Sequence, residues 1–200
     1  MENTIKVTLT AAWPSLVVLL SIYIIMRLTM YFNGERRSFV LHEEVFRLLF
    51  IAYLLVFFRL VTSQDLNTYT GTNFIPFREI LRYDIGTLNF HKQVLGNILL
   101  FIPFGYFVSC YCKIKRLGPI VLVSFLSSLV IEVVQHFIGR SFDVDDIILN
   151  VVGGVIGFLI YISLSAIYEH LPKFLKKDWL LNIVSILLIA VVALYLFKII

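Results

Sequence analysis

The sequence predicts an all-α membrane protein, a polytopic helical bundle of about six transmembrane helices with a short interfacial helix in a long outer loop. Of the 200 residues, 60% are hydrophobic and only 15% are charged, and the mean hydropathy is +0.92. A soluble domain is nearer half apolar and a quarter charged. The apolar residues also form long runs separated by short basic segments, which is the arrangement of membrane spans and their loops.

The apolar runs are long enough to cross a bilayer, and we expect them to form a single membrane domain over residues 1–200. The expected spans are residues 7–28, 45–61, 93–110, 119–137, 146–164 and 179–197. The first span has Trp13 and Pro14 near its start and Arg27 near its end, where an interfacial ring, an early proline and a snorkelling cation are tolerated. In the second span, Arg59 either snorkels outward or pairs with a carboxylate. Five spans, with the first or last helix lying flat, is the alternative.

The connection between residues 62 and 93 is the longest in the chain, and its first part is polar and rich in turn-forming residues. In its second part, Pro76 is suited to the first turn of a helix, and an imperfect amphipathic pattern follows. We expect a short helix at about Pro76–Tyr83 that lies in the membrane interface or folds back into it, roofing the outer mouth of the bundle. An ordinary solvated loop helix is the alternative.

The spans between residues 93 and 164 carry small or polar side chains at helical spacing. Residues three and four apart share a helix face, so each of these spans presents a polar stripe. Such stripes let membrane helices approach closely. The stripes are Asn97, Phe101, Gly105 and Ser109 in the third span, Ser124, Ser128, Glu132 and Gln135 in the fourth, and Asp146, Asn150, Gly153 or Gly154, and Gly157 in the fifth.

Basic residues fall on alternate connections, and the positive-inside rule places these connections in the cytoplasm. They are Arg36 and Arg37, then Lys113, Lys115 and Arg116, then Lys173, Lys176 and Lys177. Both termini, the connection at residues 62–93 and the acidic turn at residues 139–145 then face outward. Because the net charge of +4 comes from these orienting clusters, we expect no nucleic-acid partner.

Polar groups from three spans reach a similar depth at the outer mouth, where ionisable side chains need partners, water or a ligand. Arg140, with Arg78 or Arg82, is suited to hold a phosphate, because a guanidinium group matches phosphate with two hydrogen bonds. Gln135 and Asn150 are suited to sugar or peptide groups, and the apolar helix faces to a lipid chain. The candidate ligand-binding residues are Arg78, Asn97, Glu132, Gln135, Arg140, Asp143, Asp146 and Asn150.

Two other hypotheses stay open. A membrane enzyme would use Glu132, Asp143 and Asp146 as catalytic acid and base or as ligands of a divalent ion. The sequence has no nucleophile elbow, HExxH motif, P-loop or Cys/His zinc spacing, so we favour binding over catalysis and expect no metal and no cofactor. In a purely structural bundle, Glu132 pairs with Arg140 or Arg59, Gln135 pairs with Asn97, Asp146 caps the fifth span, and Asn150 bridges helices.

The motifs of the central region form an ordered set between apolar spans. They are Asn73 to Phe77 with Pro76, then Asn97 with Phe101, Pro103 and Gly105, then Glu132, Gln135, Arg140, Asp143, Asp146, Asn150, Gly153 or Gly154, and Gly157. In this order they resemble the VanZ-like family of bacterial membrane proteins, over about residues 73–157.

The resemblance implies a multi-pass protein of the bacterial cytoplasmic membrane with a role in the cell envelope. The founding member of the family is associated with low-level resistance to the glycopeptide antibiotic teicoplanin, so a link with antibiotic resistance is implied here too. Besides the lipid bilayer itself, the implied partners are a lipid-linked wall precursor or a lipoglycopeptide. For the enzyme hypothesis, the resemblance implies a lipid-linked envelope substrate. The resemblance names no protein partner and no reaction.

Overall fold

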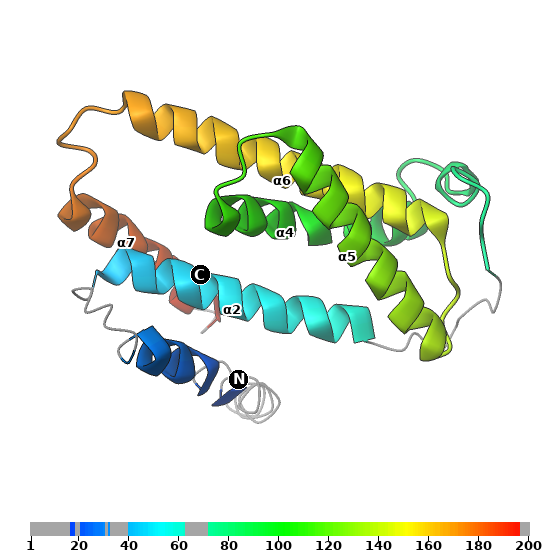
Figure 1. Cartoon of the computed structure of the whole chain (residues 1–200), viewed down its shortest axis with the longest axis horizontal. Coiled ribbons are helices and arrows are strands. Elements are labelled where there is room, and N and C mark those ends of the chain that lie inside the picture. Colours follow the sequence, from blue (N-terminus) through cyan, green and yellow to red (C-terminus); the bar gives the residue numbers. More distant parts are fainter. Residues whose placement is uncertain (1–16, 19–20, 31, 33–39, 63–71, 197–200) are drawn as a thin grey trace. The chain divides into compact units, whose positions relative to one another are not determined.

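The computed structural model describes residues 17–18, 21–30, 32, 40–62 and 72–196, and most of these residues are helical (Figure 1). No β-strand occurs among them, so the all-α prediction is confirmed for this part of the chain. The elements are α2 (Leu41–Thr62), η1 (Ile80–Arg82), α3 (Leu88–Phe90), η2 (His91–Leu95), α4 (Gly96–Cys112), α5 (Leu117–Phe137), α6 (Val144–His170) and α7 (Asp178–Leu196).

Three stretches of helix are long and apolar enough to cross a membrane, which supports the predicted membrane class. They are Leu88–Cys112, Leu117–Phe137 and Val144–His170, and they contain the predicted spans 93–110, 119–137 and 146–164. Shorter apolar helices lie at Ser21–Met30 and Asp178–Leu187. Most of the predicted first span, both termini, and Arg36 and Arg37 lie outside the described residues. The count of six spans and the orientation therefore stay predictions.

The chain divides into two compact units, of which one comprises residues 1–56 and 170–200. Its charged centre is Glu44, a buried carboxylate that accepts a hydrogen bond from Arg47 at 2.6 Å and forms an ion pair with Arg27 at 3.2 Å. Asn182 of α7 accepts a hydrogen bond at 3.0 Å from the backbone N–H of His42 in α2. Two cations thus compensate the buried carboxylate, as a low-dielectric surrounding requires.

The second unit comprises residues 57–169, and its helices α4 and α6 are in backbone contact. A methyl group added at Gly105 would overlap the carbonyl of Gly154, and one added at Gly157 would overlap the carbonyl of Ile102. Gly153 lies equally close to the backbone of α4. The predicted role of these glycines in close helix packing is confirmed, since no side chain fits between the two backbones.

The two serines of the α5 polar stripe lie against α6. Ser124 and Ser128 are fully buried, and Ser124 lies against Gly154. Asn150 donates a hydrogen bond from Nδ2 to Ser128 Oγ at 2.8 Å, so Asn150 bridges the two helices as the structural hypothesis predicts. The three helices α4, α5 and α6 form the frame that holds the candidate site (Figure 1).

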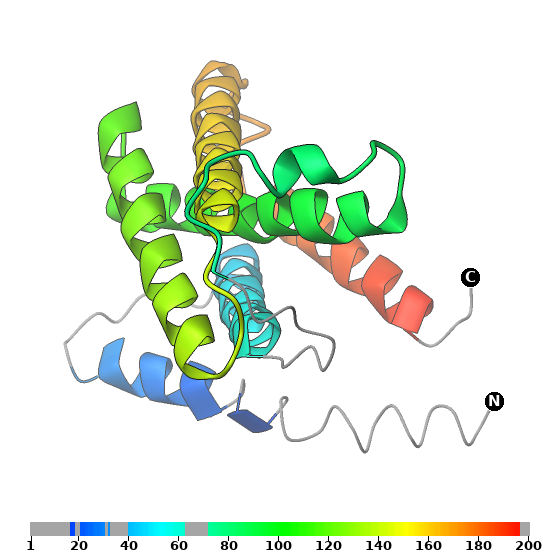
Figure 2. The same ribbon diagram turned by 90° about the vertical axis from the view of Figure 1, so that its right-hand side faces the viewer.

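The segment before α4 differs from the prediction. Instead of a regular helix at about Pro76–Tyr83, it forms turns followed by a single 3-10 turn, η1. Phe77 has a left-handed backbone with a φ of 66°, which no regular helix contains. Figure 2 shows this segment running past the start of α6. Its position relative to the membrane interface stays a prediction.

Candidate functional site

Residues 73–80 are attached to the turn that precedes α6. The backbone N–H of Asn73 donates to the carbonyl of Phe142 at 2.8 Å, and the N–H of Val144 donates back to the carbonyl of Asn73 at 3.1 Å. The side-chain amide of Asn73 also donates to Asp143 Oδ1 at 2.9 Å. This isolated parallel bridge brings two segments that are 70 residues apart in sequence to one place.

Asp145 anchors the same segment more strongly. Its side chain accepts hydrogen bonds from the backbone N–H groups of Phe77 at 2.5 Å, Glu79 at 2.7 Å and Ile80 at 3.1 Å. Asp145 is only 1% exposed, so these three donors compensate a charge that would be costly to bury alone. The carboxylate thus satisfies the N–H groups at the start of η1, which have no partner within the turn.

Asp145 was not among the predicted site residues, because the sequence places it in an acidic turn without indicating its partner. One signal was available. Pro76 is followed by residues whose N–H groups begin a helical turn, and such groups attract a carboxylate. The carboxylate that meets them is 65 to 68 residues further along the chain, and periodicity cannot identify it.

Glu132 is buried to the same extent as Asp145 and holds the turn from the other side. Its Oε2 accepts the backbone N–H of Asp143 at 2.9 Å. The structural hypothesis that Glu132 pairs with Arg140 or Arg59 is wrong within the described residues, since neither cation lies within ion-pair distance. Glu132 therefore fixes the backbone of the turn before α6 instead of neutralising an arginine.

The polar partners of α4 and α5 also differ from the predicted pairing. Gln135 does not contact Asn97, because its Nε2 donates to the carbonyl of Val61 at 3.3 Å. Asn97 donates instead to Asp146 Oδ1 at 2.5 Å, which links α4 to the first turn of α6. Asp146 thus acts between helices and also stands in the first turn of α6.

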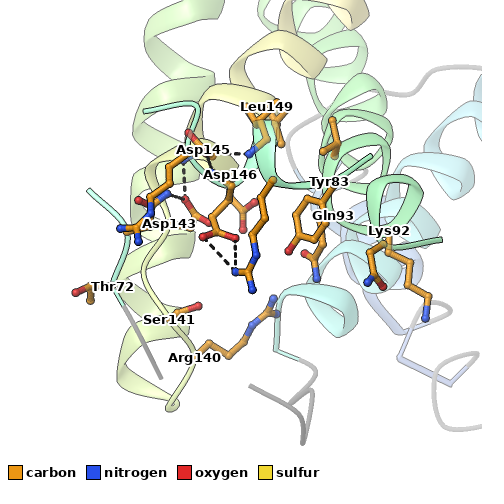
Figure 3. A pocket seen from close by; sticks show the side chains of 17 residues that line it. Thr72, Tyr83, Lys92, Gln93, Arg140, Ser141, Asp143, Asp145, Asp146 and Leu149 are labelled. Atoms are coloured by element: carbon orange, nitrogen blue, oxygen red, sulfur yellow. Dashed lines mark hydrogen bonds and ion pairs between the residues drawn. The ribbon is translucent and has the colours of Figure 1, made fainter. Parts of the chain in front are cut away.

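A cavity of about 990 Å³ opens between residues 72–95, the turn at residues 140–143 and the start of α6. Of the predicted ligand-binding residues, it is lined by Arg78, Arg140, Asp143 and Asp146. The other four, Asn97, Glu132, Gln135 and Asn150, do not line it and contact neighbouring segments instead. Figure 3 shows Asp143, Asp145 and Asp146 gathered at one part of the cavity, with Arg140 and Lys92 at others.

The sequence did not predict several cavity residues, among them Glu79, Tyr83 and Lys92. They lie on the segment before α4, whose path depends on the Asp145 contacts rather than on local periodicity. Burial raises the pKa of Tyr83 above its ordinary value, so the phenol stays protonated and can donate a hydrogen bond into the cavity.

The charges of the cavity fall into satisfied and unsatisfied groups. Arg82 and Glu79 form an ion pair at 3.1 Å, while within the described chain no ion pair involves Arg78, Lys92 or Arg140. Burial raises the pKa of Asp143 above its ordinary value, although hydrogen bonds from the N–H of Asp145 and from the amide of Asn73 oppose this shift. The cavity therefore offers both cations and carboxyl groups to a ligand.

The arrangement shows which of the proposed catalytic carboxyl groups reach the cavity. Glu132 does not line the cavity, so only Asp143 and Asp146 of the three proposed catalytic carboxyl groups can reach a bound molecule. Among the described residues, no three His, Cys, Asp or Glu side chains come together as they would around a metal ion. The lining cations can bind anionic groups of a ligand, and the lining carboxyl groups can accept hydrogen bonds from it.

Comparison with known proteins places these residues within a recognised sequence region. The VanZ/LLP1 family model matches residues 45–167, which extends beyond the predicted core of residues 73–157 to include most of α2. The chain is 31% identical over 106 residues to "Protein VanZ" of Enterococcus faecium, a match that covers 52% of this chain and 63% of that protein. The matched part thus spans less than two thirds of that relative. No solved structure matches the chain.

Proposed function

The chain belongs to the VanZ/LLP1 family, and from this premise we propose that it binds a cell-envelope ligand in the cavity between residues 72–95 and the start of α6. The ligand class is a lipid, a lipid-linked wall precursor or a lipoglycopeptide. All three combine a polar, charged head with an apolar chain, and the site has surfaces suited to both parts.

The observation that carries the proposal is the group of cations without an ion pair in the described chain. Arg78 and Lys92 are exposed, Arg140 is half-buried, and all three line one cavity. The volume of about 990 Å³ is at the upper end of the range for small-molecule sites, so a phosphate-bearing head fits within it. Guanidinium groups recognise phosphate in a bidentate way, and Arg140 is placed to begin that contact.

The apolar part of the ligand is proposed to lie along the segment that walls the cavity. This segment exposes several large apolar side chains, namely Phe74, Ile75, Phe77, Leu81, Ile85 and Leu88. Exposed apolar clusters of this kind mark membrane or lipid contacts. We propose that residues 74–88 rest in the membrane interface on the outer side of a bacterial cytoplasmic membrane, which would deliver lipid-linked molecules to the cavity.

A role in antibiotic resistance is the physiological extension of this proposal. It is supported by the similarity to Protein VanZ and by the association of the family's founding member with teicoplanin resistance. Binding of a lipid-linked wall precursor or of the antibiotic's acyl chain would alter access of the drug to its target. The proposed consequence is a raised inhibitory concentration of teicoplanin in a susceptible bacterium that produces this chain.

The test measures the melting temperature of the detergent-purified protein against lipid-linked wall precursor, anionic lipid and teicoplanin. A ligand that binds only the folded state raises the melting temperature by mass action. Arg140→Gln should remove the shift, while Arg116→Gln, an exposed arginine in the loop between α4 and α5, should preserve it. If none of the three ligands shifts the wild-type protein, the proposal fails.

A further inference from the structure

Several charged side chains that line the cavity have no ion pair in the described chain, and they indicate which ligand would bind there. This inference rests on the proposed function. We propose that the cavity selects an amphiphile whose head carries both an anionic group and a primary ammonium group. The anionic group lies against Arg140, and the ammonium group donates hydrogen bonds to Asp143 and Asp146.

Some charged groups of the cavity already have partners within the protein. Arg82 pairs with Glu79 at 3.1 Å, and Asp145 accepts three backbone N–H groups. Three cations remain on the rim of the cavity, together with two carboxyl groups, those of Asp143 and Asp146. A ligand that complements this set carries both a negative group and a positive group.

Each of the two carboxyl groups has unused capacity to accept hydrogen bonds. Asp143 uses Oδ1 for the amide of Asn73 and for the N–H of Asp145, and Asp146 uses Oδ1 for the amide of Asn97. Among the described residues, neither has an ion pair, and no hydrogen bond reaches Oδ2 of either one. Two partly buried carboxyl oxygens that face one cavity favour a cationic donor between them.

A primary ammonium group fits this position better than a metal ion or a quaternary amine. It carries three N–H donors, which can serve both oxygens at once. A metal ion needs more oxygen or nitrogen ligands than two carboxyl groups supply. Among the described residues, no group of three His, Cys, Asp or Glu side chains is placed to hold a metal ion. A trimethylammonium group has the same charge and no donor, so it would leave the carboxyl oxygens unpaired.

The same charges oppose ligands of a single sign. A purely anionic head would meet Asp143 and Asp146 across the cavity, and a purely cationic head would meet Arg140 and Lys92 (Figure 3). Unfavourable contacts of this kind are how a site discriminates between related ligands. An aminophospholipid and a lipid-linked precursor with a free amine share the required chemistry.

The test compares two lipids with the same acyl chains, phosphatidylethanolamine and phosphatidylcholine, for binding to the full-length protein in detergent. In phosphatidylcholine, three methyl groups replace the three ammonium hydrogens, so the charge is kept and the N–H donors are lost. We expect about tenfold tighter binding of phosphatidylethanolamine, the effect of one charge-assisted hydrogen bond. Soluble phosphoethanolamine is a third ligand, and its binding would show that the head suffices without the bilayer-forming chains. A lipid-linked precursor with its amine free or acetylated forms a second pair, in which the free amine should bind more tightly.

Variants test whether the preference for phosphatidylethanolamine depends on the proposed side chains. Asp146→Asn, which keeps an acceptor for Asn97, should bind both lipids equally, whereas Asp178→Asn at the exposed start of α7 should keep the tenfold preference. Asp143→Asn provides a second variant if Asp146→Asn folds poorly. Equal binding of both lipids by the wild-type protein would overturn the inference while leaving the proposed function intact. Failure of every amphiphile to bind would overturn both.

Discussion

At the scale of single residues, Asp145 holds a segment that lies 65 to 68 residues earlier in the chain. Its carboxylate accepts three backbone N–H groups and is almost fully buried, so it determines the path of residues 77–80. Phe77 adopts a left-handed backbone in this segment, a conformation that is unfavourable for a bulky residue unless its surroundings enforce it. The contacts of Asp145 supply that enforcement.

Replacing Asp145 should therefore destabilise the protein and disorganise the cavity wall. For Asp145→Ala we expect a loss of about 3 kcal/mol, because buried N–H groups lose a charged acceptor. Asp145→Asn keeps one carbonyl oxygen as an acceptor and should cost less. The melting temperature of the purified variants measures the effect, and Asp84→Ala, at an exposed aspartate of the same connection, is the control. Equal melting temperatures for Asp145→Ala and Asp84→Ala would show that the contacts contribute little.

At the scale of helices, the contact between α4 and α6 depends on glycine rather than on interlocking side chains. The backbones approach so closely at Gly105 and Gly157 that an added methyl group would overlap a carbonyl of the facing helix. Neither helix can move away without losing the neighbouring contacts, including the bond from Asn97 to Asp146.

Substitution of these glycines by alanine should show how much of their effect on stability comes from helix packing and how much from helix propensity. Gly105→Ala and Gly157→Ala should each destabilise the protein by about 1–3 kcal/mol or more, which is the usual range for overpacking. Gly118→Ala is the matched control, because an added methyl group there meets no atom within 4 Å and alanine favours the helix. Thermal denaturation of the three variants under one set of conditions measures the effect. Unchanged stability of Gly105→Ala would contradict the close approach of α4 and α6 at this position.

The helices themselves could be predicted from the sequence, but their partners could not. Hydropathy located α4, α5 and α6 to within a few residues, except that α6 continues to His170, beyond the predicted end at residue 164. Spacing correctly placed Ser124, Ser128 and Glu132 on one buried face. It did not show that Gln135 reaches Val61, or that Asn97 reaches Asp146, because a face does not specify which residue it meets.

The cavity was the least predictable part for the same reason. The turns at residues 76–79 replace the expected helix because a distant carboxylate satisfies their N–H groups, and no local signal contains that information. Four of the eight predicted ligand residues line the cavity, and the other four hold the segments around it in position. The sequence thus identifies the polar residues as a group, but it does not show which of them line the cavity.

At the scale of the whole molecule, orientation in the membrane is the property that the proposed function requires. The positive-inside rule places residues 62–93 outside and the loop at residues 113–116 in the cytoplasm. In intact cells, Asp84→Cys should therefore react with a membrane-impermeant maleimide, since Asp84 is exposed in the outer connection. The natural Cys112, exposed at the other end of α4, should react only after the cells are made permeable. The reverse pattern of labelling would place the cavity on the cytoplasmic side.

The bond between Asp145 and residues 77–80 also has a consequence for biosynthesis. The N–H groups of Glu79 and Ile80 leave the ribosome 66 and 65 residues before the carboxylate that satisfies them. At ordinary rates of translation this interval lasts several seconds, on the order of 3 to 13 s. In the course of this interval α4 and α5 leave the ribosome, while the outer segment still lacks its acceptor. The arrival of the first turn of α6 would therefore complete the cavity, which makes the site a late product of assembly and a point at which the unfinished protein is exposed to quality control.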